Sequence, residues 1–341
     1  MLAPFRSAVL LAAFGTACVA VRLGDGGDEL AASAALTGSA GGDVVSERAT
    51  VSSALDRITK RTPELNGLAT WAGDGRGVSI YVFDGGVDQS NPELAGRVRI
   101  GYDAFPSRPR VCNAHGTAVA GAAAGASLGV APRAEIVDVK IINCATRRGT
   151  LDAIVAAARW TASDHRRHPF QPAVANWSFM VDTDKVFPSL DTAAKVLHDA
   201  GVLIVASAGN LDIDACRVAP ANSRRTLVVG SSSVLRDELH HGIADYRTPE
   251  TAWGRCIDIY APGDSVLLPG ADNGTSATSY WGGTSMSAGY VSGAAALVLE
   301  RTPFASPDVV RAALEQRATP DAVDERTRPA ARKGKLLYIG P

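Results

Sequence analysis

The clearest strand signal in the chain is Val78-Ser79-Ile80-Tyr81-Val82-Phe83, followed by Asp84-Gly85-Gly86. Five of the first six residues are β-branched or aromatic, which is typical of a strand. The Asp-Gly-Gly that follows is a turn signal. The sequence therefore predicts a strand over residues 78–83 that ends at a turn carrying Asp84.

Other segments of the same kind follow along the chain. Further strands are predicted at residues 134–142, 202–208 and 226–230. Helical patterns lie between and after these strands, at residues 151–165, 190–200 and 285–300. Alternation of strands and helices over this length predicts an α/β fold, with a doubly wound, mostly parallel sheet flanked by helices in a single domain.

Composition limits the classes of partner. The 341 residues include 34 Lys and Arg against 35 Asp and Glu, a formal net charge of −1. A charge so close to zero gives no reason to expect a nucleic acid or an anionic membrane as a partner. The long uncharged run at residues 273–299 is rich in Gly, Ser and Thr, so it does not predict a membrane span. We expect a monomer.

The N-terminus differs from the rest of the chain. Arg6 precedes an apolar stretch over residues 8–21 with small residues where cleavage would fall, which predicts a secretory signal over residues 1–20. Lipoprotein anchoring at Cys18 is a minor alternative, because Leu is missing three residues before it. Residues 21–49 are Gly- and Ala-rich without apolar periodicity and predict a linker or short pro-segment. The folded domain is then expected over residues 50–341.

The cysteines agree with export. Removing Cys18 leaves four of the five, and an even number in an exported chain predicts two disulfides with three pairings open. A zinc site is the competing interpretation, but the sequence contains no C-x-x-C pair and no His-x-x-x-His. The four cysteines are Cys112, Cys144, Cys216 and Cys256.

Three polar residues lie where elements begin or end. Asp84 follows a strand, His115 precedes a helix of small residues, and Ser285 begins an apolar helix. Taken singly, these residues are ordinarily a turn aspartate, a structural histidine and a helix N-cap. Their occurrence together, in the order Asp, His, Ser, favours nucleophilic catalysis by a serine. An α/β-hydrolase would have the order Ser, Asp, His and a Gly-x-Ser-x-Gly motif, which this sequence lacks.

The three motifs resemble the active-site signatures of the subtilisin family, and the cysteine placement resembles its proteinase K-like, aqualysin-type branch. The resemblance covers residues 55–338 and implies a subtilisin-like fold and a secreted serine endopeptidase acting on polypeptides. It implies that Ser285 is the nucleophile, His115 the general base and Asp84 the group that orients His115. Asn210, in Ala-Ser-Ala-Gly-Asn, matches the side-chain donor to the oxyanion, with the Ser285 N–H as the second donor.

The resemblance also implies the pairs Cys112–Cys144 and Cys216–Cys256. No cofactor is required for the chemistry, but Asp258 matches a carboxylate that binds structural Ca²⁺ in proteinase K-like relatives. The other ligands of that ion would be backbone carbonyls near Arg224 and Thr226. The alternative is that Asp258 accepts hydrogen bonds in a turn.

Substrate is expected to add as a strand between two edges. One edge carries Arg147 and Arg148, and the other carries Ser178 and Phe179. Two positively charged side chains at the rim predict a modest preference for acidic residues, unless both point into solvent. Ala208 and Gly209, next to Asn210, complete the expected substrate-binding residues.

Several departures from the family pattern keep a second hypothesis open. Gly85 replaces a hydroxyl residue, Ala118 replaces a second histidine, Gly289 replaces a proline, and Arg147 with Arg148 replaces a Gly-containing edge. The alternative function is a catalytically weak subtilisin-like scaffold that binds peptides or proteins. Relatives also carry a long propeptide, whereas residues 21–48 show no strand signals, and the sequence leaves the reason open.

Overall fold

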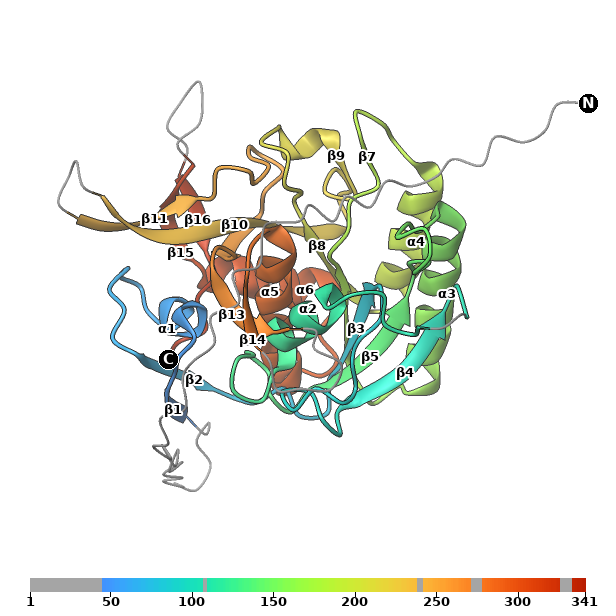
Figure 1. Ribbon diagram of the computed structural model, residues 1–341, viewed down its shortest axis with the longest axis horizontal. Coiled ribbons are helices and arrows are strands. Elements are labelled where there is room, and N and C mark those ends of the chain that lie inside the picture. The colour runs from blue at the N-terminus through green and yellow to red at the C-terminus, as the bar shows by residue number, and fades with distance from the viewer. Residues whose placement is uncertain (1–44, 107–108, 238–241, 271–277, 326–332) are drawn as a thin grey trace, which may run out of the picture.

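The structure is a computed structural model, and it describes residues 45–106, 109–237, 242–270, 278–325 and 333–341. A ten-stranded sheet runs through the centre of this part of the molecule (Figure 1). Its strands in spatial order are β4 (Val98–Asp103), β5 (Glu135–Lys140), β3 (Ser79–Asp84), β6 (Ala173–Trp177), β8 (Leu203–Ser207), β10 (Thr226–Asp237), β12 (Ile259–Pro262), β16 (Lys333–Leu336), β15 (Thr319–Asp324) and β11 (Gly242–Arg247).

The pairing of these strands confirms the predicted sheet. From β4 to β16 each strand runs parallel to its neighbours. Antiparallel pairing joins β15 to β16 and the distal half of β10 to β11. Three two-stranded ribbons complete the described strands: β1 (Val45–Ala49) with β2 (Leu68–Ala72), β7 (Asp182–Thr183) with β9 (Val218–Ala219), and β13 (Val266–Pro269) with β14 (Thr278–Trp281).

Side chains of β3 alternate between two apolar layers. Ile80 and Val82 belong to one buried cluster, whereas Tyr81 and Phe83 belong to another on the opposite face of the sheet. Since successive residues of a strand point to opposite faces, this short apolar segment anchors both layers. The first cluster extends from Ala54 to Ile339, so one core joins both ends of the described chain in a single domain.

Helices cover both faces, as the doubly wound prediction requires. The face of Ile80 packs against α2 (His115–Ala124) and α5 (Thr284–Arg301), which also contact each other. The opposite face packs against α3 (Leu151–Arg167) and α4 (Pro188–Asp199), which lie together at the right of Figure 1. The remaining helices of the described residues are α1 (Ser53–Ile58), α6 (Pro307–Arg317) and the 3₁₀ turn η1 (Ala215–Arg217).

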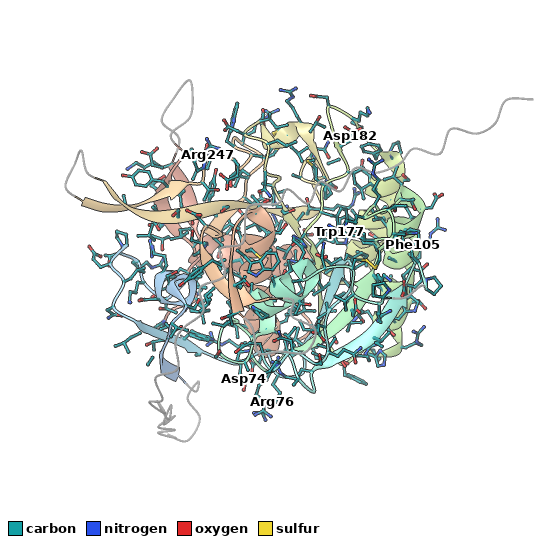
Figure 2. The ribbon with its side chains drawn as sticks, viewed as in Figure 1. Asp74, Arg76, Phe105, Trp177, Asp182 and Arg247 are labelled. Atoms are coloured by element: carbon teal, nitrogen blue, oxygen red, sulfur yellow. A yellow bond between two sulfur atoms is a disulfide. The ribbon has the colours of Figure 1, made fainter. Side chains whose placement is uncertain are left out.

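Buried and exposed side chains divide as expected for such layers. Figure 2 shows Trp177 in the interior near α4, whereas Asp74 and Arg76 lie on the outer rim. Trp177 is fully buried, and its ring is 5.8 Å from that of Phe83. None of the helices in the described ranges combines the length and the apolar character needed to cross a bilayer.

Two predicted boundaries differ from the observed ones. The strand predicted to end at residue 230 continues to Asp237, because its distal half pairs with β11. Residues 45–49 of the expected linker form β1 along the edge of β2. Pairing with an available strand edge can order a segment that has no apolar periodicity of its own. The expected signal at residues 1–20 lies outside the described residues.

Candidate active site

Asp84 lies at the carboxyl end of β3, between β5 on one side and β6 on the other. At β3 the strand order reverses its direction of growth, and such a switch point opens a crevice at the carboxyl ends of the strands. The Asp84 residue is 3% exposed, and its Oδ1 accepts a hydrogen bond of 2.7 Å from the N–H of Gly85. Asp84, the first residue of the predicted site, therefore lies at the position where doubly wound folds bind ligands.

His115 is the first residue of α2 and lies against Asp84. Its Nδ1 is 2.7 Å from Asp84 Oδ2, and because an ionised carboxylate only accepts hydrogen bonds, Nδ1 carries the proton and donates it. The backbone N–H of His115 donates to the side chain of Asn113. Gly116 is required for this approach, since a Cβ there would lie 3.0 Å from the Cβ of Asp84 and 2.5 Å from the carbonyl oxygen of Gly86.

The neighbourhood of His115 sets its pKa. Burial disfavours the charged imidazolium and lowers the pKa, but the Asp84 carboxylate raises it through its charge and its hydrogen bond, and the net pKa is raised. Trp281, at the end of β14, presents its ring edge-on to the imidazole at 6.5 Å between centroids. The arrangement leaves Nε2 of the neutral imidazole with a lone pair, as a general base requires.

Ser285 is the second residue of α5, after the N-cap Gly283. It is 9% exposed, and its Oγ lies 3.5 Å from the carbonyl oxygen of Ser178, to which it donates. Within the described ranges, Ser285 Oγ makes no hydrogen bond to the ring of His115. The Ser285 N–H is one of the first four amides of α5, so it has no acceptor within the helix.

The Asn210 side chain is oriented by Thr284. Its Oδ1 accepts hydrogen bonds from the N–H of Thr284 at 3.0 Å and from the hydroxyl of Thr284 at 2.9 Å. The same hydroxyl accepts from the N–H of Gly209 at 3.2 Å. Because a backbone N–H can only donate, Oδ1 must face Thr284, and the Nδ2 donor is directed away from it. Sequence reasoning missed Thr284, Asn113 and Trp281, although Thr284 is next to Ser285 and Asn113 precedes His115 by two residues.

The expected substrate edges differ in their burial. Ser178 is 5% exposed, and its hydroxyl donates to the carbonyl oxygen of Ser285 at 3.1 Å. The Phe179 side chain is 3% exposed and packs on Trp177, so this residue can offer a substrate only its backbone. Ala208 is fully buried. The edge at Ser178 is therefore tied to the turn that carries Ser285.

Arg147 and Arg148 lie on the surface, in a tight loop after β5. The N–H of Asn143 donates to the carbonyl of Arg148 at 2.9 Å, and the N–H of Arg147 donates back to the carbonyl of Asn143 at 2.7 Å. Both arginines are exposed, and neither forms a salt bridge within the described part of the chain. Their charges are therefore free to act on a substrate or on solvent.

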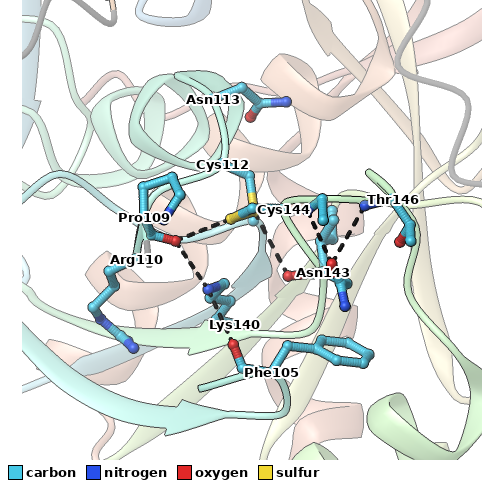
Figure 3. The surroundings of a disulfide bond; sticks show 12 residues. Phe105, Pro109, Arg110, Cys112, Asn113, Lys140, Asn143, Cys144 and Thr146 are labelled. Atoms are coloured by element: carbon cyan, nitrogen blue, oxygen red, sulfur yellow. Dashed lines mark hydrogen bonds between the residues drawn. A yellow bond between two sulfur atoms is a disulfide. The ribbon is translucent and has the colours of Figure 1, made fainter. Parts of the chain in front are cut away.

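Two disulfides join the pairs that the resemblance implies. Cys112 is bonded to Cys144, and Cys216 to Cys256. Figure 3 shows the first bridge between the segment that leads to Asn113 and the loop after β5. It ties the segment before His115 to the loop that carries the two exposed arginines.

The residues of the expected calcium site, Asp258 with the carbonyls of Arg224 and Thr226, contact a side-chain cation. The guanidinium of Arg311, in α6, donates to Asp258 Oδ1. It also donates to the carbonyl of Arg224 at 3.3 Å and to that of Thr226 at 3.1 Å. Asp258 Oδ2 accepts from the N–H of Val228 at 2.8 Å. Ca²⁺ takes six to eight oxygen ligands, and here the three expected ones already hold a cation, so these residues do not fit the ion.

No cluster of three or more His, Cys, Asp and Glu side chains able to hold a metal occurs in the described ranges. The pKa of Asp258 is raised, because burial raises it more than the Arg311 charge and the Val228 N–H lower it. Asp258 therefore belongs to an internal ion pair, which joins the start of β12 to α6. Sequence reasoning missed Arg311 because nothing in its local sequence marks it.

Comparisons with known proteins identify the family of this chain. The model of the subtilase family matches residues 75–334. An extracellular serine proteinase of Thermus sp. (strain Rt41A) is 37% identical over 276 residues, which are 80% of this chain and 63% of that protein. Alkaline serine exoprotease A of Vibrio alginolyticus is 34% identical over 286 residues, 83% of this chain and 49% of that protein. The chain thus matches less than two thirds of the length of either relative.

A solved structure shows the same fold. The crystal structure of a cold adapted subtilisin-like serine proteinase matches with a TM-score of 0.73 at 31% sequence identity, over 86% of this chain and 99% of that one. The family match covers the segment from the turn before β3 to the last strand of the sheet, and so includes Asp84, His115, Asn210 and Ser285. The chain is a member of the subtilase family.

Proposed function

We propose that this chain is a secreted serine endopeptidase in which Asp84, His115 and Ser285 form the catalytic triad and Asn210 donates to the oxyanion. The observation that carries the proposal is the hydrogen bond of 2.7 Å between His115 Nδ1 and a buried carboxylate, at the switch point of the sheet. That bond fixes the tautomer in which Nε2 can accept a proton. The family match and the names of the relatives support the same reaction class.

The proposed reaction has two halves. Nε2 of His115 takes the hydroxyl proton of Ser285 while Oγ attacks the scissile carbonyl carbon, and the imidazolium then gives that proton to the leaving amine. His115 then takes a proton from water as the water oxygen attacks the acyl carbon, and it returns that proton to Ser285 Oγ as the acyl–Oγ bond breaks and the acid leaves. In each tetrahedral intermediate the oxyanion accepts hydrogen bonds from Asn210 Nδ2 and from the Ser285 N–H. No metal or cofactor takes part in these steps.

Polypeptide substrates would bind as an added strand between the two edges. Ser178 and Phe179 would offer backbone groups on one edge, because the Phe179 side chain is buried. Gly209 has a positive φ of 99° beside Asn210, where a narrow backbone leaves room near the reacting carbonyl. The loop with Arg147 and Arg148 would form the other edge.

A peptide-binding scaffold with weak activity is the second candidate. The observation in its favour is the contact of Ser285 Oγ with the Ser178 carbonyl in place of a hydrogen bond to His115. In the endopeptidase, the Ser285 hydroxyl would leave this contact and donate to Nε2 of His115. In the scaffold, the hydroxyl would stay on Ser178 and remain unreactive.

Labelling with a fluorophosphonate probe separates the two candidates. The endopeptidase predicts covalent modification of the wild type at Ser285 and none in Ser285→Ala. It also predicts release of new N-termini from a denatured protein substrate. A wild type that binds peptide and is neither labelled nor able to cleave would support the scaffold.

Secretion is part of the proposal. The Thermus relative is named as extracellular, and two disulfides fit an oxidising compartment. The expected signal at residues 1–20 and the alternative anchor at Cys18 both lie outside the described residues. Analysis of the culture medium and the N-terminus of the exported protein tests secretion, and analytical ultracentrifugation tests the expected monomer.

A further inference from the structure

A partly buried ion-pair cluster joins β4, β5 and the segment before His115, and it takes no part in the proposed reaction. Asp138, on β5, is fully buried, and its Oδ2 accepts a hydrogen bond of 2.7 Å from Nη2 of Arg110. Nη1 of the same guanidinium donates to Asp103 Oδ2 at 2.9 Å. Burying a carboxylate costs free energy unless it is paired, so the guanidinium is held between two carboxylates from neighbouring strands.

Arg110 also lies between the loop after Asp84 and the start of α2 at His115. It precedes His115 by five residues, and its carbonyl oxygen would lie 2.5 Å from a Cβ at Gly86. The N–H of Cys112 donates to the carbonyl of Gly85 at 2.9 Å. The loop that follows Asp84 is thus packed directly against the segment that leads to His115.

Asp138 links this cluster to the loop after Asp84 through Arg110. Burial raises the pKa of Asp138 to about 6 against the opposing effect of the Arg110 charge, and the charge of Asp84 raises it further. The carboxylate of Asp138 holds the guanidinium of Arg110, and the backbone of Arg110 packs on Gly86 in the loop after Asp84.

A second cation completes the cluster. Lys140 is fully buried, and its Nζ lies 3.7 Å from Asp103 Oδ2. Figure 3 shows its hydrogen bonds to the carbonyls of Phe105 and Pro109, each 3.3 Å long, beside the Cys112–Cys144 bridge. Two cations face two carboxylates, so the cluster is neutral and can remain buried.

We propose that Arg110 and Asp138 are a positioning pair that holds the Asp84 loop against the segment before His115 and so keeps the Asp84–His115 hydrogen bond at catalytic length. The pair touches neither substrate nor reacting atoms. The proposal rests on the proposed endopeptidase function for its kinetic consequence. Its geometric consequence, the order of the His115 imidazole, does not depend on turnover. Small displacements of catalytic groups lower the reaction rate strongly. Loss of the pair is therefore expected to lower kcat and to leave KM nearly unchanged.

The test compares two buried carboxylates that are both paired with arginine. Asp138→Asn removes the charge that holds Arg110. Asp164→Asn is the matched control. Asp164, on α3, is 3% exposed and accepts a hydrogen bond of 2.8 Å from Arg99, on β4. Neither residue contacts His115 or Asp84. A double variant, Arg110→Met/Asp138→Leu, removes both charges, so no unpaired charge is left buried to prevent folding.

We expect kcat to fall about tenfold in Asp138→Asn and in the double variant, with KM within about twofold of wild type. The low-field proton NMR signal of the His115 Nδ1–H should weaken or move upfield in both variants. Asp164→Asn should have the kcat and the NMR signal of the wild type. A folded double variant with wild-type kcat and an unchanged signal overturns the proposal, as does an equal loss in Asp164→Asn. A wild type without peptidase activity would overturn the proposed function instead, and the NMR comparison would still decide the positioning role.

Discussion

Asp84 and Asp258 lie at opposite ends of two parallel strands, and each is paired with a different kind of basic side chain. Asp84, at the carboxyl end of β3, faces an imidazole that can gain or lose a proton near neutral pH. Asp258, just before β12, faces the guanidinium of Arg311, which stays charged at any pH that the fold survives. The first pair can therefore move protons, and the second can only hold chain segments together.

The largest expected effect separates these two roles. Asp84→Asn should lower kcat by about 10³–10⁴, because Nδ1 loses the carboxylate that fixes the base tautomer. Asp258→Asn should leave kcat within about twofold of wild type while lowering the melting temperature. Steady-state kinetics on one peptide substrate measures both. Comparable kcat losses in the two variants would remove the distinction.

The oxyanion donor should give the next effect. Asn210→Ala should lower kcat by about 10²–10³ with little change in KM, since the lost hydrogen bond forms in the transition state. Thr284→Val removes the hydroxyl that orients Asn210 Oδ1 but keeps the Thr284 N–H, so its loss should be smaller. A larger loss in Thr284→Val than in Asn210→Ala would contradict the orienting role.

Arg311 should matter for stability alone. Arg311→Ala leaves the Asp258 carboxylate without its cation, which should cost about 2 kcal/mol, less than for a fully buried pair because both side chains keep some exposure. Thermal unfolding measures the loss. Chelator should not lower the melting temperature of the wild type through this site. A chelator effect that disappears in Asp258→Asn would restore the calcium hypothesis.

The pH dependence tests the first pair directly. His115 must be neutral to act as a base, and its pKa is raised, so kcat/KM should fall on acidification through a pKa above 6.5. In the other direction, the stability that the charged His115 gains from Asp84 is present at low pH and is lost as pH rises through that raised pKa. An acid limb below 6.5 in the wild type would contradict the assignment.

The smallest effect concerns Arg147 and Arg148. Exposed charges contribute about 0.2–1 kcal/mol, so a preference for acidic residues two to four positions before the cleaved bond should reach about fivefold and weaken with salt. Profiling of peptide-library cleavage at low and high salt, with wild type and Arg147→Ser/Arg148→Gly, measures it. Identical profiles would mean that both side chains point into solvent.

Local sequence predicted the elements that carry their own signal. The strand at Val78 was placed within one residue of β3, because a buried strand is recognisable from a few β-branched and aromatic side chains. Ser285 was predicted at the start of a helix and lies in the first turn of α5. The other strands of the sheet, β4, β6, β11, β12, β15 and β16, were not predicted from the sequence. The side chains of β4, β15 and β16 are largely half-buried, exposed or polar, whereas β6 and β12 are buried but only five and four residues long.

The fold class, the order of the three motif residues and the four cysteines of the domain follow from sequence alone, because the signals lie within short stretches of neighbouring residues. Which basic side chain pairs with each aspartate depends on the tertiary structure. Arg311 reaches Asp258 from 53 residues away and Arg110 reaches Asp138 from 28 residues away. Such contacts depend on how helices and loops pack on the sheet, and a charged side chain has no local pattern that identifies its partner.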